Sequence, residues 1–105
     1  MNMAAFWHDL ADWSQATFGD DKTRGPVGPL KHLAKEVREA LADPTDKMEY
    51  VDCLFPVFDA ARRAGLTYGE LLGLSWKKLA INKARQWPKP SSDEPVEHVG
   101  EGVSA

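Results

Sequence analysis

The chain has 105 residues, a formal net charge of −3 and 28% charged residues. This length suits one domain with a small core, which gains stability by burying a second face against a copy of itself. The acidic balance disfavours a nucleic-acid-binding protein, which needs a basic excess. The sequence shows no signal-peptide pattern and no apolar run of membrane-spanning length. We therefore expect a cytoplasmic protein that binds neither nucleic acid nor a membrane.

Hydrophobic periodicity and the positions of Gly and Pro predict four helices. The first is expected over residues 3–18, where apolar residues recur at helical spacing, and Gly19 ends it. Residues 19–29 contain three Gly and two Pro and are expected to form a loop. This loop could close over a ligand or be a plain connection.

The second helix is expected over residues 30–43 and the third over residues 46–64, with Asp or Thr before it as N-cap and Gly65 after it. Thr67 should cap a fourth helix over residues 68–87, which Pro88 terminates. Trp13 and Trp76 lie on apolar stripes, so we expect them in the core. The second helix has an apolar stripe of its own, formed by Leu30, Leu33, Ala34, Val37 and Leu41.

Four helices with short connections predict an all-α fold, a four-helix bundle completed by oligomerisation. We expect the folded domain to span residues 1–88. Residues 89–105 are rich in Pro, Ser and Glu. This tail should be disordered, or ordered only where it packs on the body of the domain.

The third helix carries its polar residues in one strip on an otherwise apolar surface. The strip contains Glu49, Asp52, Asp59 and Arg63. Carboxylates crowded together on a buried helix repel one another and lose hydration, so they need a compensating cation. A divalent metal ion meets that need.

The second helix supplies a matching pair, Glu36 and Glu39, one turn apart and away from the apolar stripe, with His32 one turn earlier. If the short turn makes the two helices antiparallel, this pair faces Glu49 and Asp52. Four hard oxygen donors suit Mg²⁺ or Mn²⁺. Taken alone, an acidic pair on a helix is usually only a solvated face, and this remains the competing interpretation.

The fourth helix adds a polar stripe of Lys78, Asn82 and Arg85. Lys and Arg bind phosphate oxygens, and Asn binds a phosphate or a sugar hydroxyl. Basic residues near a helix C-terminus are also favoured by the helix dipole alone. Trp87, at the expected helix end, could stack on a base. Carboxylates on two helices and cations on a third together indicate a triphosphate site.

Several segments of the sequence resemble those of a known family. HLAKEVREAL followed by EYVDCL is similar to the E-x-x-E…E-x-x-D signature of the MazG-like all-α nucleotide pyrophosphohydrolases, and KLAINKARQWP resembles the K-x-x-x-N-x-x-R stretch that follows it. The order of segments from about residue 6 to residue 99 most resembles the small dATP/dGTP diphosphohydrolases of bacteria and phages.

The resemblance implies a MazG-like bundle that hydrolyses a purine deoxynucleoside triphosphate, dGTP or dATP, to the monophosphate and pyrophosphate. Glu36, Glu39, Glu49 and Asp52 would hold Mg²⁺ or Mn²⁺, with Glu36 or Glu39 as the base that activates water. Lys78, Asn82 and Arg85 would bind the substrate, and His32, beside the acidic group, is a further candidate for substrate binding. The resemblance also implies a homodimer or homotetramer, and it suggests that His98 belongs to a tail that folds over the site.

Two other interpretations stay open. The same chemistry could act on dUTP, dCTP or phosphoribosyl-ATP, because the walls of the base pocket cannot be placed from one sequence. Alternatively, the chain could be a non-catalytic helical interaction module whose acidic residues are merely solvated.

Overall fold

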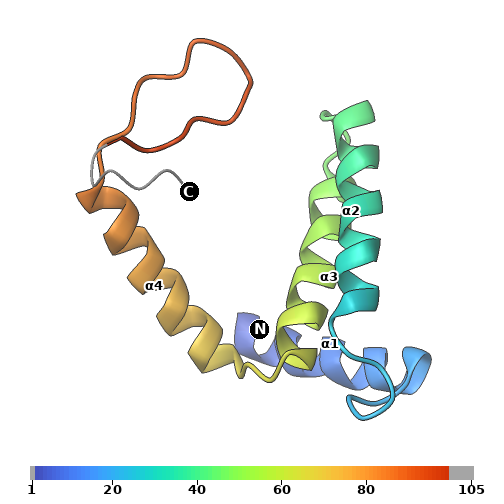
Figure 1. Cartoon of the computed structure of the whole chain (residues 1–105). Helices are drawn as coiled ribbons and strands as arrows, with labels where there is room; N and C mark the ends of the chain where they lie inside the picture. The colour runs from blue at the N-terminus through green and yellow to red at the C-terminus, as the bar shows by residue number, and fades with distance from the viewer. Residues whose placement is uncertain (1, 100–105) are drawn as a thin grey trace. The chain divides into compact units, whose positions relative to one another are not determined.

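The computed structural model describes residues 2–99, which form four helices (Figure 1). They are α1 (Met3–Phe18), α2 (Val27–Ala42), α3 (Met48–Arg63) and α4 (Tyr68–Ala84). Within the described range the β pairing is limited to an isolated antiparallel bridge between Gln86 and Val99. The predicted all-α class is therefore confirmed. None of these helices is both long enough and apolar enough to cross a membrane.

Helix ends form where the local chemistry of the sequence predicts them. Thr67 and Glu70 make a reciprocal capping box: Glu70 N donates to Thr67 Oγ1 over 3.1 Å, and Thr67 N donates to Glu70 Oε1 over 2.9 Å. The Asp46 carboxylate accepts a bond from Met48 N at the start of α3. Gly19 ends α1 with φ +106°, a conformation that only glycine adopts without strain.

Two predicted helix boundaries were wrong by three residues. Helix α2 begins at Val27, because Leu30 N already bonds to Pro26 O and Pro29 occupies the first turn, where no N–H partner is needed. Helix α4 ends at Ala84 rather than at residue 87. There the Asn82 carbonyl accepts bonds from Arg85 N and from the Trp87 indole, which close the last turn.

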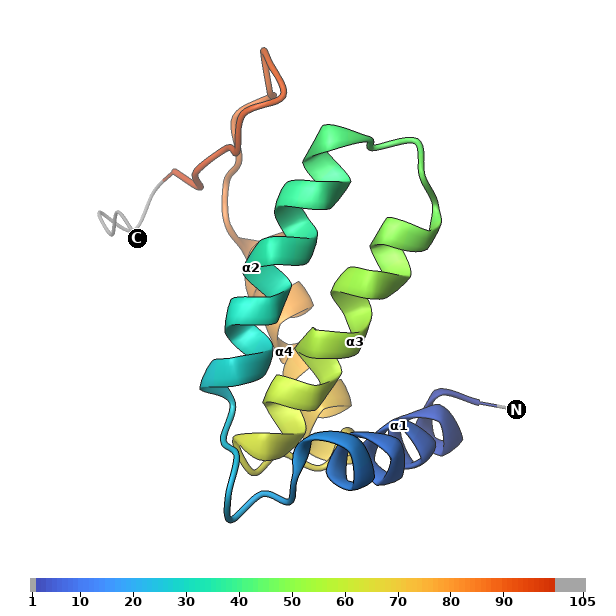
Figure 2. The ribbon, with the colours of Figure 1, turned by 90° about the vertical axis from the view of Figure 1, so that its right-hand side faces the viewer.

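The chain divides between Leu71 and Leu72 into two units, and each is described by itself. In the first unit, α2 and α3 run antiparallel side by side, and α1 crosses the end of this pair at which α2 begins and α3 ends (Figure 2). Aromatic rings fill the crossing of α1 and α3: Phe6 lies 5.3 Å from Phe55, and Trp7 lies 5.2 Å from Phe58 between ring centroids. In the described residues, the buried hydrophobic side chains of the core are Trp7, Leu10, Ala11 and Ala60.

A buried polar network also joins α1, α3 and the loop that follows α1. The side chain of Arg63 is fully buried and donates to Asp59 Oδ2 over 3.1 Å and to Ser14 Oγ over 3.0 Å. The same guanidinium donates to three backbone carbonyls of the loop, those of Gly19, Asp20 and Arg24, over 2.8 to 3.3 Å. One side chain of α3 therefore fixes the path of the loop.

The single chain leaves several predicted core residues uncovered. Trp13 is 53% exposed and Trp76 is 67% exposed, so their assignment to the core was wrong for the isolated chain. On the apolar stripe of α2, Leu30, Val37 and Leu41 are likewise exposed. Helical spacing identifies an apolar face correctly but does not show whether the same chain covers it.

We expect Asp59→Asn to destabilise the protein by about 3–5 kcal/mol at pH 7, because it leaves the buried Arg63 guanidinium without its counter-charge. Burial raises the pKa of Asp59, but hydrogen bonds from Arg62, Ser14 and Arg63 outweigh that effect and lower the pKa below its ordinary value. The ion pair therefore stabilises the fold above the unfolded-state pKa of about 3.9, and this stability is lost as the pH falls through the lowered folded-state value.

Urea unfolding at pH 7 and at pH 3 checks this expectation. The difference between wild type and Asp59→Asn should shrink at pH 3, whereas Asp9→Asn, a change at an exposed position of α1, should have little effect at either pH. Equal stability of wild type and Asp59→Asn at pH 7 would contradict the assigned role.

Candidate metal centre

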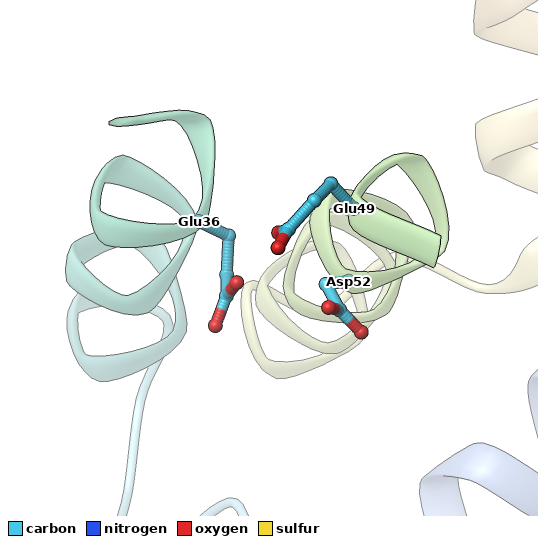
Figure 3. A group of neighbouring side chains, drawn as sticks. All are labelled: Glu36, Glu49 and Asp52. Atoms are coloured by element: carbon cyan, nitrogen blue, oxygen red, sulfur yellow. The ribbon is translucent and has the colours of Figure 1, made fainter. Parts of the chain in front are cut away.

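Three carboxylates from two helices meet in the first unit. Glu36 comes from the middle of α2, and Glu49 and Asp52 come from the first two turns of α3, directly after the turn that makes the helices antiparallel. Each offers one carboxylate oxygen, and these oxygens all lie within 4.8 Å of one another. Figure 3 shows Glu36 pointing from α2 toward the side chains of α3. The structure thus brings together three of the four predicted metal ligands.

Glu39 lies one turn beyond Glu36 and is more exposed. A side-chain hydrogen bond with Glu36 and the negative charge of Glu36 raise the pKa of Glu39, and the charge of Asp52 adds to the effect. The same hydrogen bond lowers the pKa of Glu36, assisted by His32. Glu39 therefore shares the electrostatic field of the cluster although it lies outside the group of three.

The cluster is electrostatically strained when no cation is bound. Burial raises the pKa of Glu49, and the charges of Glu39 and Asp52 raise it further. Glu49 Oε2 is buried and has no hydrogen-bond partner among the described residues. Burial and the neighbouring carboxylates also raise the pKa of the Cys53 thiol, which disfavours the thiolate needed for nucleophilic catalysis. A divalent cation bound between the carboxylates would relieve this repulsion.

His32 supports the cluster from α2. Its Nε2 lies 2.8 Å from Glu36 Oε1, one helical turn away. Residues that hydrogen-bond to a ligand carboxylate fix its orientation, and they influence metal affinity almost as strongly as the ligands do. His32 is therefore placed to orient Glu36 rather than to act at a separate site.

The predicted substrate-binding residues of the C-terminal part lie in the second unit. Lys78 and Asn82 are on α4, and Arg85 follows its last residue. The Trp87 indole donates to the Asn82 carbonyl over 2.7 Å, and the Trp87 and His98 rings lie 5.6 Å apart in an edge-to-face arrangement. Val99 N donates to Gln86 O, so the chain near His98 returns to the end of α4. Within this unit the structure brings Asn82, Trp87 and His98 together.

A cavity of about 200 Å³ lies beside the carboxylates, within the first unit. Glu36 and Asp52 form part of its wall, and Asp59, already paired with Arg63, forms another part. Much of the remaining wall is aromatic or basic and comes from Trp13, Phe18, Phe55 and Arg24. Sequence reasoning assigned Trp13 to the core and did not assign Phe18 to the site, although both lie on α1. Arg24 lies in the loop that could close over a ligand, and its place depends on the path of that loop, for which the sequence gives no periodic signal.

Comparison with known proteins agrees with this geometry. The profile of the dATP/dGTP pyrophosphohydrolase family matches residues 6–104. The chain belongs to this family. The fold is therefore that of a nucleotide pyrophosphohydrolase domain.

One curated protein and one solved structure are similar to this chain. The Eaa protein of Salmonella phage P22 is 50% identical over 91 residues, which are 87% of this chain and 28% of that protein. The chain thus spans about a quarter of the length of this curated relative. The cyanophage S-2L MazG-like pyrophosphohydrolase, whose structure holds dGDP and three catalytic Mn²⁺ ions per active site, superposes with a TM-score of 0.77 at 27% identity. The match covers 95% of this chain and 99% of the cyanophage chain, which confirms the predicted MazG-like fold.

We expect Glu49→Gln and Asp52→Asn each to weaken Mn²⁺ binding at least about tenfold, because even substitutions of outer-shell partners cost roughly 10–100-fold in metal affinity. Titration calorimetry with Mn²⁺ measures the change. Asp12→Asn, at an exposed position on α1, is the matched control and should bind Mn²⁺ like the wild type. The thermal stability of the metal-free Glu49→Gln protein should not fall, since the change removes repulsion. Unchanged Mn²⁺ affinity in both cluster variants would exclude the site.

Proposed function

We propose that the protein hydrolyses a purine deoxynucleoside triphosphate, dGTP or dATP, to the monophosphate and pyrophosphate, with Mg²⁺ or Mn²⁺ as cofactor. The observation that carries this proposal is the group of carboxylates from α2 and α3 within 4.8 Å of one another. The family to which the chain belongs and the dGDP and Mn²⁺ bound by the cyanophage relative support the same substrate class and cofactor.

The donor set fits these metals. Glu36, Glu49 and Asp52 offer hard carboxylate oxygens, and Glu39, one turn from Glu36, is the candidate for a fourth ligand. Mg²⁺ and Mn²⁺ prefer such oxygens, keep several waters and accept phosphate oxygens as further ligands. Bound divalent ions would supply neutralisation of the triphosphate charge and acidification of a bound water.

The reaction needs a base that accepts a proton from the attacking water. The water oxygen forms a bond to the α-phosphorus, the bond from that phosphorus to the bridging oxygen breaks, and pyrophosphate leaves with the electron pair. Glu36 and Glu39 are the candidates for the base. His32 holds Glu36 Oε1 at 2.8 Å, which orients the Glu36 carboxylate, whereas Glu39 is more exposed to solvent. Turnover of Glu36→Gln and Glu39→Gln at saturating Mn²⁺ separates the two roles, because the loss of a base lowers kcat even when the metal site is filled.

The base of the substrate needs different contacts from its phosphates and sugar. Its base suits the cavity beside Glu36 and Asp52, whose 200 Å³ is below the ~300–1,000 Å³ that encloses a whole drug-sized ligand and so suits one ring system. For the phosphates and sugar we assign Lys78, Asn82 and Arg85, because cationic side chains and an amide are the donors that these groups accept. Trp87 and His98 complete this second group.

We expect wild-type protein to release pyrophosphate from dGTP or dATP with Mg²⁺ or Mn²⁺, and to lose this activity in EDTA. Asp52→Asn should lower kcat at least about 100-fold, because metal coordination supplies several kcal/mol of charge stabilisation. A panel that includes dUTP and dCTP, scored for pyrophosphate, measures both effects. Circular dichroism should show the fold unchanged. Full turnover by the Asp52→Asn protein would overturn the enzymatic role of the cluster.

We also propose that the protein assembles as a homodimer or homotetramer. Leu30, Val37 and Leu41 recur on one face of α2 and are 51%, 42% and 76% exposed. A continuous apolar stripe of this kind usually marks an interface. Because the buried apolar core of the described chain is small, a second copy would cover the stripe and add the burial that the single chain lacks.

Leu41→Glu combined with Leu30→Glu should convert the assembly to monomers, since the stripe would then have to bury two carboxylates. Light scattering coupled to gel filtration gives the mass directly. Lys31→Glu places a new carboxylate on the same helix at an exposed position outside the stripe and should leave the mass unchanged. A monomeric wild type, or a double variant of wild-type mass, would refute this interface.

A further inference from the structure

Arg24 is held at the cavity wall by features that no catalytic role explains. Its backbone carbonyl accepts a 2.9 Å bond from Arg63 Nη1, so the loop is anchored to α3 directly at this residue. Its guanidinium carbon lies 5.4 Å from the centre of the Phe18 ring, a cation–π arrangement. The Phe18 ring in turn packs edge-on against Trp13 at 5.4 Å. Trp13, Phe18 and Arg24 therefore form one continuous part of the cavity wall.

The absence of a side chain at Gly28 makes room for this guanidinium. A Cβ on Gly28 would lie 2.6 Å from Arg24 Nη2 and 2.8 Å from its Cζ. Arg24 Nε is buried and has no hydrogen-bond partner among the described residues. The chain thus keeps a cation, one of whose donors has no partner among the described residues, in the partly aromatic wall of a cavity that also includes the carboxylates Glu36 and Asp52.

The chemistry of the two purines decides what such a group can distinguish. Guanine presents two adjacent acceptors, O6 and N7, which match the paired donors of an arginine. Adenine presents N7 beside an amino group, which is a donor and would face the donors of the guanidinium. A site built around a hydrogen bond rejects the analogue that lacks it, because its buried polar groups are then left unpaired.

We propose that Arg24, given space by Gly28, reads O6 and N7 of the purine and selects guanine over adenine. This inference rests on the proposed function, since it assigns the base of the same substrate to the cavity beside the carboxylates. The aromatic wall supplies contacts with the ring faces that any base can use. Arg24 supplies the contact that depends on which base is bound.

The experiment measures kcat/KM for dGTP, dATP and dITP with wild type, Arg24→Ala, Gly28→Ala and the double variant. Inosine keeps O6 and N7 but lacks the 2-amino group of guanine, so it isolates the edge that Arg24 would contact. Gly28→Ala displaces only the end of a flexible side chain, and alanine favours the helix, so the fold is kept. Lys22→Ala removes a cation from an exposed position of the same loop and serves as the control.

We expect wild type to prefer dGTP over dATP and to treat dITP like dGTP. Arg24→Ala should reduce the ratio of dGTP to dATP on the order of 10- to 100-fold. Gly28→Ala should shift the ratio in the same direction in the wild-type background and have no further effect once Arg24 is alanine. Lys22→Ala should leave the ratio unchanged.

Several outcomes would overturn the inference while leaving the proposed function intact. Equal losses for dGTP and dATP in Arg24→Ala would place the guanidinium on a phosphate or in a purely structural role. A wild type that handles dITP like dATP would show that the 2-amino group is read instead. An additive effect of Gly28→Ala in the Arg24→Ala background would show that the glycine serves another purpose. If wild type releases no pyrophosphate from any nucleotide, the proposed function itself fails.

Discussion

The buried guanidinium of Arg63 is the interaction on which the first unit depends. It neutralises Asp59 within α3, donates to Ser14 of α1 and fixes the path of the following loop by donating to three of its backbone carbonyls. Breaking a buried, fully bonded ion pair on one side is far costlier than losing a surface pair. The crossing of α1 over α3 and the position of the loop are therefore coupled to one side chain. The same bonds fix the position of Arg24, the residue of this loop that lines the cavity.

The candidate metal centre differs from the Arg63 network in how its charges are arranged. Around Arg63 every charge has a partner, whereas Glu36, Glu49 and Asp52 meet without a cationic side chain between them, and burial together with the neighbouring carboxylates raises the pKa of Glu49. Glu36 is buried where an apolar side chain would pack α2 on α3 more favourably. Burial of these carboxylates costs stability, and a bound divalent ion would offset that cost.

Local chemistry in the sequence was sufficient to predict the helices and the acidic cluster. The cap at Thr67 and the short turn after α2 are encoded by a few adjacent residues, and that turn leaves Glu36 facing Glu49 and Asp52. The pairing of Asp59 could not be predicted in the same way. Asp59 shares a helical face with Asp52, but Asp59 is bonded by Ser14 of α1, whereas Asp52 lies beside Glu36 of α2. Periodicity identifies a face of a helix and not the segment that packs on it.

The position of Arg24 illustrates the same limit over a longer range. Its carbonyl accepts a hydrogen bond from Arg63, 39 positions later in the chain, and no short sequence motif predicts such a contact. The exposed Trp13 marks a related limit, because an apolar stripe looks alike whether its own chain, a second copy or a ligand covers it. Predicting these features requires the tertiary structure, since they depend on which segments meet.

One face of helix α3 connects the carboxylate cluster with the Arg63 network. Asp52, Pro56 and Asp59 all line the cavity and follow one another at helical spacing. At a rise of about 1.5 Å per residue, Asp52 and Asp59 are separated by about 10 Å along the axis. Pro56 has no N–H to donate to the Asp52 carbonyl, yet the helix continues through it, so the two charged positions stay on one rigid element. The length of the cavity between the carboxylate cluster and the Arg63 network is therefore set by α3, and a ligand must match that length to contact both the carboxylates and the loop.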